Sequence, residues 1–189
     1  FEKKAGREKG KLPSIFWFYL FFTFFTTLGF LNFALLGYHF KAARVLEDFQ
    51  IPLFYAFAML VDAFFALLIG KAYDRLKVKR KSGLGLLVII PFLSLVIPLL
   101  VFLHSFWLAL IGILVWGAVL GAHETIMRAA IADIVQESRR GTAYGIFTAA
   151  YGFAIFLGST FAGVLYEQAF WFLASFVFLA QAFAIATFI

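Results

Sequence analysis

Charged side chains lie inside apolar segments of this sequence that are long enough to cross a bilayer. Asp62 falls near the middle of the apolar run 51–70, where a carboxylate costs roughly 2.5–3.5 kcal/mol on membrane-insertion scales. Glu124 and Arg128 stand four residues apart in another run, so a helix would place them on one face, in the order that favours an ion pair. Charges kept at this depth bind a solute or a proton, or pair inside the protein. The sequence leaves both interpretations open.

Other polar side chains share the apolar runs with these charges. Tyr144, Thr148 and Tyr151 recur at helical spacing and therefore lie on one face of a helix. The candidates for binding a solute or a proton are Asp62, Glu124, Asn32, Tyr151 and His123. For Arg128 and Asp133 we favour a structural or gating role, since both fall toward the end of a long span.

The sequence does not favour an enzyme. His123-Glu124-x-x-Met127 lacks the second histidine of the zinc-protease pattern HExxH, and the serine of a G-x-S-x-G elbow is missing. Cysteine is absent, which excludes disulfides, thiol catalysis and cysteine metal sites. We therefore predict no catalytic residues, no metal and no cofactor.

The composition indicates a membrane protein. Of 189 residues, 64% are hydrophobic and only 14% are charged, which is more apolar surface than a soluble domain of this length can bury. The net charge of +6 comes from basic residues that lie between the apolar runs. Anionic headgroups and membrane topology explain these residues, so nucleic acid is not expected as a partner.

Six apolar runs reach the length of about 20 residues that a transmembrane helix needs. They are continuous, without the alternation of barrel strands, so we predict an all-α polytopic bundle. The expected spans are 14–38, 51–72, 84–103, 105–134, 142–166 and 169–189, after a basic tail at 1–13. Thirteen of the sixteen Lys and Arg residues fall on one side of these spans. The positive-inside rule then places the N-terminus and the loop 73–83 in the cytoplasm, with the chain in the plasma membrane.

The six spans differ in polarity. The third and sixth carry no ionisable residue in their apolar cores, so they can face lipid all round and are expected to be peripheral. The first, second, fourth and fifth are expected to form an inner set. Pro91 and Pro98 are expected to kink the third span. In the fifth span, the pairs Gly141/Gly145 and Ser159/Gly163 predict close contacts with neighbouring helices.

Two segments resemble signatures of the major facilitator superfamily. Residues 70–80 resemble the motif G-x-x-x-D-[RK]-x-G-[RK]-[RK] that follows the second helix of each half. Gly70, Asp74, Arg75 and the pair 79–80 match it, and Lys77 replaces the second glycine. Residues 139–145 are similar to the R-G-x-A-x-G that opens the eleventh helix in many bacterial members. The likeness covers nearly the whole chain and is closest to the C-terminal six-helix half, with the basic tail similar to the end of the central loop.

This resemblance implies a secondary active transporter half that moves a small organic solute by alternating access. The partner half would belong to the same longer chain or to a second copy. Proton coupling is one option because the carboxylates could titrate if desolvated. A sugar or a drug would suit the aromatic residues Tyr151 and Trp116. The alternative function is a scaffold or sensing module with the same fold and no transport.

The resemblance also implies a gating cluster at the cytoplasmic end. Asp74 is expected to approach the start of the fifth helix at Gly141–Tyr144, with Arg128 as a further partner. The residues assigned to this cluster are Gly70, Asp74, Arg75, Arg128, Asp133, Arg140 and Gly141.

Overall fold

The computed structural model describes residues 11–80 and 84–188, and this part of the chain contains helices and no strand. Six segments are long and apolar enough to cross a membrane, which confirms the predicted all-α, six-span architecture. The elements are α1 (Ser14–Leu28), α2 (Phe33–Ala42), α3 (Gln50–Arg80), η1 (Leu84–Val88), α4 (Ile89–Val101), α5 (Phe106–Ile134), η2 (Glu137–Arg139), α6 (Arg140–Gln168) and α7 (Phe170–Phe188).

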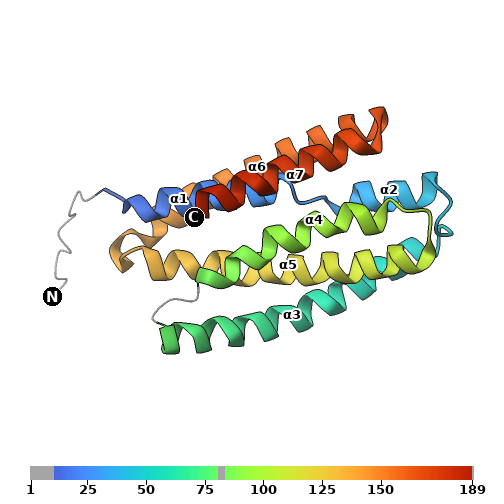
Figure 1. The fold of residues 1–189 in the computed structure, drawn as a ribbon. Coiled ribbons are helices and arrows are strands. Elements are labelled where there is room, and N and C mark those ends of the chain that lie inside the picture. Colours follow the sequence, from blue (N-terminus) through green and yellow to red (C-terminus); the bar gives the residue numbers. More distant parts are fainter. Residues whose placement is uncertain (1–10, 81–83, 189) are drawn as a thin grey trace.

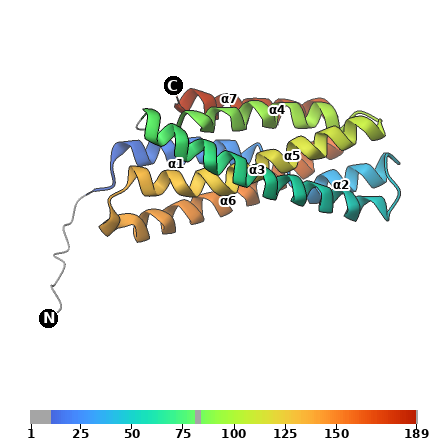
Figure 2. The ribbon, with the colours of Figure 1, turned by 90° about the horizontal axis from the view of Figure 1, so that it is seen from below.

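The helices run roughly parallel to one long axis and form an elongated bundle (Figures 1 and 2). In Figure 2, α4 and α7 lie along one edge of the bundle and α6 lies along the opposite edge. In Figure 1, α3 lies along the lower edge of the bundle, and α6 and α7 lie along the upper edge. The most extensive contacts join α3 to α5, α4 to α5, and α1 to both α6 and α7. Helix α3 is therefore attached to the bundle mainly through α5.

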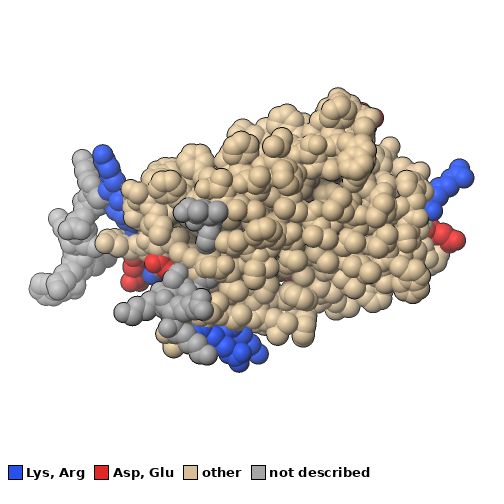
Figure 3. Space-filling model, in the orientation of Figure 1, with Lys and Arg blue, Asp and Glu red and all other residues tan. Residues whose placement is uncertain are grey.

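The charged residues lie at the two ends of the bundle on the face shown in Figure 3, and a broad uncharged band separates them. One end, here called the basic end, contains Lys11, the last turns of α3 and the α5–α6 turn. The opposite end contains the α2–α3 turn, where Lys41 pairs with Asp48 at 2.8 Å. This band is what a six-span protein presents to the hydrocarbon core.

The first span is broken, in contrast to the continuous helix expected over 14–38. Helix α1 ends at Leu28 and α2 begins at Phe33. The Asn32 side chain starts α2 by accepting a hydrogen bond from the Leu35 N–H at 2.9 Å, as an N-cap residue does. At the end of α1, a Cβ on Gly29 would lie 2.8 Å from Ala180. Only glycine fits between α1 and α7 at this position.

Neighbouring helices supply donors to the carbonyl groups that the break releases. Trp116 of α5 donates from Nε1 to the Leu31 carbonyl at 2.7 Å, and Gln181 of α7 donates from Nε2 to the Thr26 carbonyl at 3.0 Å. Both donor side chains are buried. Irregular backbone at membrane depth persists only where the protein satisfies it in this way. The break is therefore stabilised by α5 and α7.

Substituting Gln181 by Met should weaken the docking of α7 on α1. Methionine keeps the length of the side chain and removes the donor to Thr26. Hydrogen bonds between membrane helices contribute about 0.6–1.7 kcal/mol, so we expect a loss of about 1 kcal/mol in the free energy of unfolding. Titration of the purified protein with sodium dodecyl sulfate measures this loss. Gln168→Met is the control, because Gln168 is exposed at the end of α6; equal stability of the two variants would contradict the assignment.

The third and sixth spans do not face lipid all round, although their sequences would allow it. Helix α4 buries a stripe that includes Ile90 and Ile97, and α7 buries Leu173 and Val177. A helix at the edge of a bundle still packs one face on its neighbours, and its sequence shows no polar stripe because its other face meets lipid.

Two further boundaries differ from the predicted spans. Helix α3 continues to Arg80, so most of the expected loop 73–83 is helical, and its residues 81–83 lie outside the described structure. The buried side chain of Tyr73 anchors this last part of α3 on the bundle. The third span begins as the 3₁₀ segment η1, and α4 starts at Ile89. Pro91 therefore falls in the first turn of α4, where a missing N–H breaks no helical bond, and Pro98 alone lies inside the helix.

Close helix contacts occur at different glycines from those predicted. A Cβ on Gly117 would collide with the Ala58 carbonyl oxygen, and one on Gly158 would collide with the Leu28 carbonyl oxygen. At Gly141, Gly145 and Gly163 nothing lies within 4 Å. The predicted close contacts at these three glycines are therefore wrong for the described chain. At these glycines, α6 has no neighbouring helix among the described residues within contact distance.

Candidate functional site

A small polar pocket lies between α5 and α6. It has a volume of about 80 Å³ and is lined by His123, Glu124, Arg128, Phe147, Thr148 and Tyr151. The two helices make few contacts with each other, so the side chains between them are not packed tightly. Three of the five candidates for binding a solute or a proton, namely His123, Glu124 and Tyr151, therefore share one pocket.

Glu124 and Arg128 present opposite charges to this pocket. Both residues are exposed in the six-helix chain. They do not form the ion pair that their spacing allows: the salt bridges found in the described chain are Lys41–Asp48 and Lys77–Asp133. A carboxylate and a guanidinium one helical turn apart, each with its hydrogen-bonding capacity available, can hold a polar or charged group between them.

His123 is a buried imidazole on the wall of the same pocket. It is 1% exposed, and its ring stacks on Phe30 with a centroid distance of 5.0 Å. Neither ring nitrogen has a hydrogen-bond partner within the described chain. A buried polar group left in this condition costs about 1–3 kcal/mol. A polar group that enters the pocket and bonds to the ring would recover part of this free energy.

Asp62 approaches α5 one turn away from Glu124. A Cβ on Gly121 would lie 3.1 Å from the Asp62 Oδ1 atom, and this oxygen is buried without a hydrogen-bond partner in the described chain. Gly121 precedes Glu124 by three residues, so Asp62 of α3 meets α5 about one helical turn from Glu124. They interact electrostatically. The structure therefore brings Asp62 near Glu124 and does not supply a structural donor to its buried oxygen.

Asn32 occupies a different position from the other candidates. Its Nδ2 donates to the Ser159 Oγ atom at 2.7 Å, and its Oδ1 accepts from the Leu35 N–H. One end of the amide thus connects the break in the first span to α6, and the other end caps α2. The structure does not bring Asn32 into the pocket between α5 and α6.

Asp133 organises a second cluster at the basic end. Its two carboxylate oxygens accept from the Tyr73 hydroxyl at 2.8 Å and from the Lys77 ammonium at 2.5 Å. These contacts join the extension of α3 to the last turn of α5. Gly70 packs on Thr125 nearby, since a Cβ added to Gly70 would lie 3.3 Å from the Thr125 methyl carbon. This cluster joins α3 to α5.

The start of α6 is held by different contacts. Arg140 donates from Nη2 to the Ala132 carbonyl at 2.8 Å and from Nε to the Val135 carbonyl at 3.4 Å, which satisfies carbonyls at the end of α5. The Tyr144 hydroxyl donates to the Arg128 carbonyl at 3.1 Å. Asp74 does not share this site, because α3 and α6 lie on opposite sides of the bundle (Figures 1 and 2). The expected approach of Asp74 to Gly141–Tyr144 is therefore not found in the described chain.

Comparison with known proteins decides the family. A family model of the Major Facilitator Superfamily matches residues 15–189. The chain belongs to the major facilitator superfamily. This confirms the resemblance seen in the two motifs.

Curated relatives of this facilitator chain come from Mycobacterium bovis and from two strains of Mycobacterium tuberculosis, and each is named an uncharacterized protein. Each is 40% identical over 156 residues, which cover 82% of this chain and 37% of the relative. The chain thus spans little more than a third of the length of these relatives. No solved structure gives a significant match.

Sequence reasoning missed two structural contacts of this facilitator chain. Lys77, the residue that departs from the family motif, forms the ion pair with Asp133, and no local pattern connects two residues so far apart. Trp116 supports the break in the first span. Its depth in the fourth apolar run was visible, but its partner depends on the break itself.

Proposed function

We propose that this chain is one half of a secondary active transporter, which moves a small organic solute across the plasma membrane by alternating access. One observation carries the proposal: Glu124 and Arg128 line a common pocket, unpaired with each other, beside a buried His123 whose ring nitrogens lack partners in the described chain. Charged groups kept in membrane spans in this state usually serve a solute or ion pathway.

A second six-helix half would cover the pocket. Glu124 and Arg128 are exposed on the described chain, and exposure of either charge to hydrocarbon costs several kcal/mol. A second half removes this cost if it encloses a water-filled path between the two halves. The second half would come from the same longer chain or from a second copy of this one.

The break in the first span gives this half an element that could change shape. Phe30, between α1 and α2, stacks on Trp116 at 5.6 Å and on His123 at 5.0 Å. A change in the angle between α1 and α2 would move Phe30 and alter access to His123. Discontinuous helices beside a midplane site have this role in many transporters.

The charge distribution supports an orientation with the basic end in the cytoplasm. By sequence, thirteen of the sixteen Lys and Arg residues belong to the segments on that side of the spans. Proton coupling fits the same site, because the Asp62 carboxylate of α3 approaches α5 about one helical turn from Glu124. Under this proposal the solute binds at the pocket while a carboxylate gains or loses a proton.

Uptake by proteoliposomes tests the proposal. The full-length protein is reconstituted, incubated with a defined mixture of small organic solutes and assayed by mass spectrometry, with and without an imposed proton gradient. We expect at least one solute to accumulate above the level in protein-free vesicles. No accumulation of any solute, with the protein folded and correctly inserted, would favour the scaffold or sensing function instead.

A further inference from the structure

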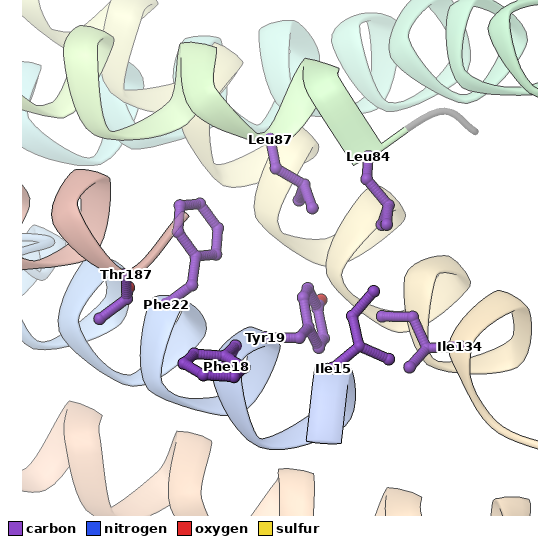
Figure 4. A pocket seen from close by; sticks show the side chains of 8 residues that line it. All are labelled: Ile15, Phe18, Tyr19, Phe22, Leu84, Leu87, Ile134 and Thr187. Atoms are coloured by element: carbon purple, nitrogen blue, oxygen red, sulfur yellow. The ribbon is translucent and has the colours of Figure 1, made fainter. Parts of the chain in front are cut away.

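An apolar pocket opens beside α1 at the basic end (Figure 4). It has a volume of about 160 Å³, and its lining includes Ile15, Phe18 and Phe22 of α1, Leu84 and Leu87 of η1, and Ile134 of α5. Figure 4 shows these side chains converging from α1, η1 and the end of α5. We call this pocket the apolar slot.

The apolar slot runs inward from the membrane surface. Ile15 and Phe22 are seven residues apart, which is about 10 Å along a helix. Ile15 and Phe18 at the outer side are 51% and 63% exposed, whereas Phe22 and Leu87 are fully buried. The one hydroxyl-bearing ring in its wall, Tyr19, is already bonded to the Met127 carbonyl at 2.5 Å. The slot therefore offers an open, elongated and apolar surface.

A second pocket of about 360 Å³ adjoins the slot, and Ile134 lines both. We call it the basic mouth. Its lining includes Lys11 and Arg139 together with the neutral polar side chains of Gln136 and Ser138, and among the described residues that line it there is no carboxylate. The mouth therefore favours an anion by charge, at the level where lipid headgroups lie.

We propose that the slot and the mouth together bind one anionic phospholipid from the leaflet at the basic end. An acyl chain fills the slot, and the phosphate lies in the mouth between Lys11 and Arg139. A soluble anion would use only the mouth, and a neutral lipid would gain only the slot. The two pockets adjoin in the order of chain and headgroup, which favours a ligand that carries both. This site is separate from the pocket between α5 and α6 and does not depend on the transport proposal.

Native mass spectrometry of the full-length protein in detergent tests the basic mouth. The protein is titrated with dioleoylphosphatidylglycerol or with dioleoylphosphatidylcholine, which differ in headgroup charge and share their acyl chains. We expect tighter binding of the first. Lys11→Gln and Arg139→Gln should each weaken it about five-fold, the effect of one cation near a membrane surface. Lys41→Gln, at the opposite end, should leave the affinity unchanged.

A substitution that fills the apolar slot tests whether an acyl chain binds there. Ile15→Trp places a larger ring at the half-exposed entrance, so the fold should tolerate it, and binding of phosphatidylglycerol should fall at least ten-fold. Phe21→Trp is the control, since Phe21 is 55% exposed on the same helix and does not line the slot. Thermal unfolding of each variant verifies that it is folded.

Three results would overturn the proposal. Equal affinity for the two lipids would show that the basic mouth does not select an anionic headgroup. An unchanged affinity in Ile15→Trp would show that the apolar slot does not bind the acyl chain. Competition by inorganic phosphate at the affinity of phosphatidylglycerol would identify a site for soluble anions only. Each of these results can be obtained whether or not the protein transports a solute.

Discussion

Gly121→Ala is expected to destabilise the bundle by about 3 kcal/mol, the upper part of the usual range for overpacking. The added Cβ would lie 2.5 Å from the Asp62 carbonyl oxygen and 3.0 Å from the Ala66 backbone nitrogen. Both obstacles are backbone atoms, so no side-chain rotation can relieve the contact. Helix α3 would have to move away from α5, which provides most of its contacts.

The same reasoning applies to Gly117, one turn earlier on α5, where an added Cβ would collide with the Ala58 carbonyl oxygen. Denaturation by sodium dodecyl sulfate, followed by circular dichroism, measures the loss in the free energy of unfolding. Gly145→Ala is the matched control, because nothing lies within 4 Å of its Cβ position; alanine there should raise stability by up to about 1 kcal/mol through helix propensity. A Gly121→Ala protein as stable as the control would refute the close approach of α3 and α5.

Glu124→Gln is expected to reduce solute uptake about 100-fold. The substitution keeps the size of the side chain and removes its charge beside Arg128. Loss of one member of a set of opposed charges at a binding site costs about 2–5 kcal/mol, and about 2.7 kcal/mol corresponds to 100-fold in affinity. Initial rates of uptake in proteoliposomes, with the solute identified in the wild-type protein, give the measurement.

The free energy of unfolding of Glu124→Gln shows whether Glu124 has a structural role in addition to a role in uptake. Glu124 is exposed and has no ion pair among the described residues, so its substitution should change the free energy of unfolding by less than about 0.5 kcal/mol. Glu167→Gln, at the exposed end of α6, is the control and should transport normally. Normal uptake by Glu124→Gln would show that the pocket between α5 and α6 does not bind the solute.

The six spans could be predicted from the sequence because each is a local property of about 20 consecutive residues. The break in the first span could not, since it depends on donors from Trp116 and Gln181, which lie far along the chain. The same is true of the extension of α3. Tyr73 and Lys77 are ordered by Asp133, which follows them by 60 and 56 residues, and their local sequence is typical of a charged loop.

Helix contacts were predicted at the wrong glycines for a related reason. Small residues spaced by four occur in both α5 and α6, and spacing alone does not reveal which pair meets another backbone. In the structure, Gly117 and Gly121 of α5 contact α3, whereas Gly141 and Gly145 of α6 have no neighbour at their Cβ positions. Only the packing of α3 on α5 distinguishes the two pairs.

The candidate site was predictable where its members share a helix face. His123 and Glu124 on α5 and Tyr151 on α6 line one pocket, as expected from polar residues in two inner spans. Asn32 differs because its amide caps α2 and bonds to Ser159. A polar residue in an apolar span can satisfy irregular backbone as well as bind a solute, and only the broken helix distinguishes the two roles.

The most direct test of the account is whether water reaches the wall formed by α5 and α6. These 189 residues contain no cysteine. Once any cysteine elsewhere in the full-length protein has been replaced by serine, single cysteines can be placed at Thr148, in the pocket, and at Leu179, on the exposed outer face of α7. The two positions lie eight and nine residues from the starts of their helices, or about 12–14 Å deep. A membrane-impermeant thiol reagent should modify Thr148→Cys and leave Leu179→Cys unmodified in reconstituted full-length protein. Equal resistance of both cysteines would contradict a solute pathway along this wall.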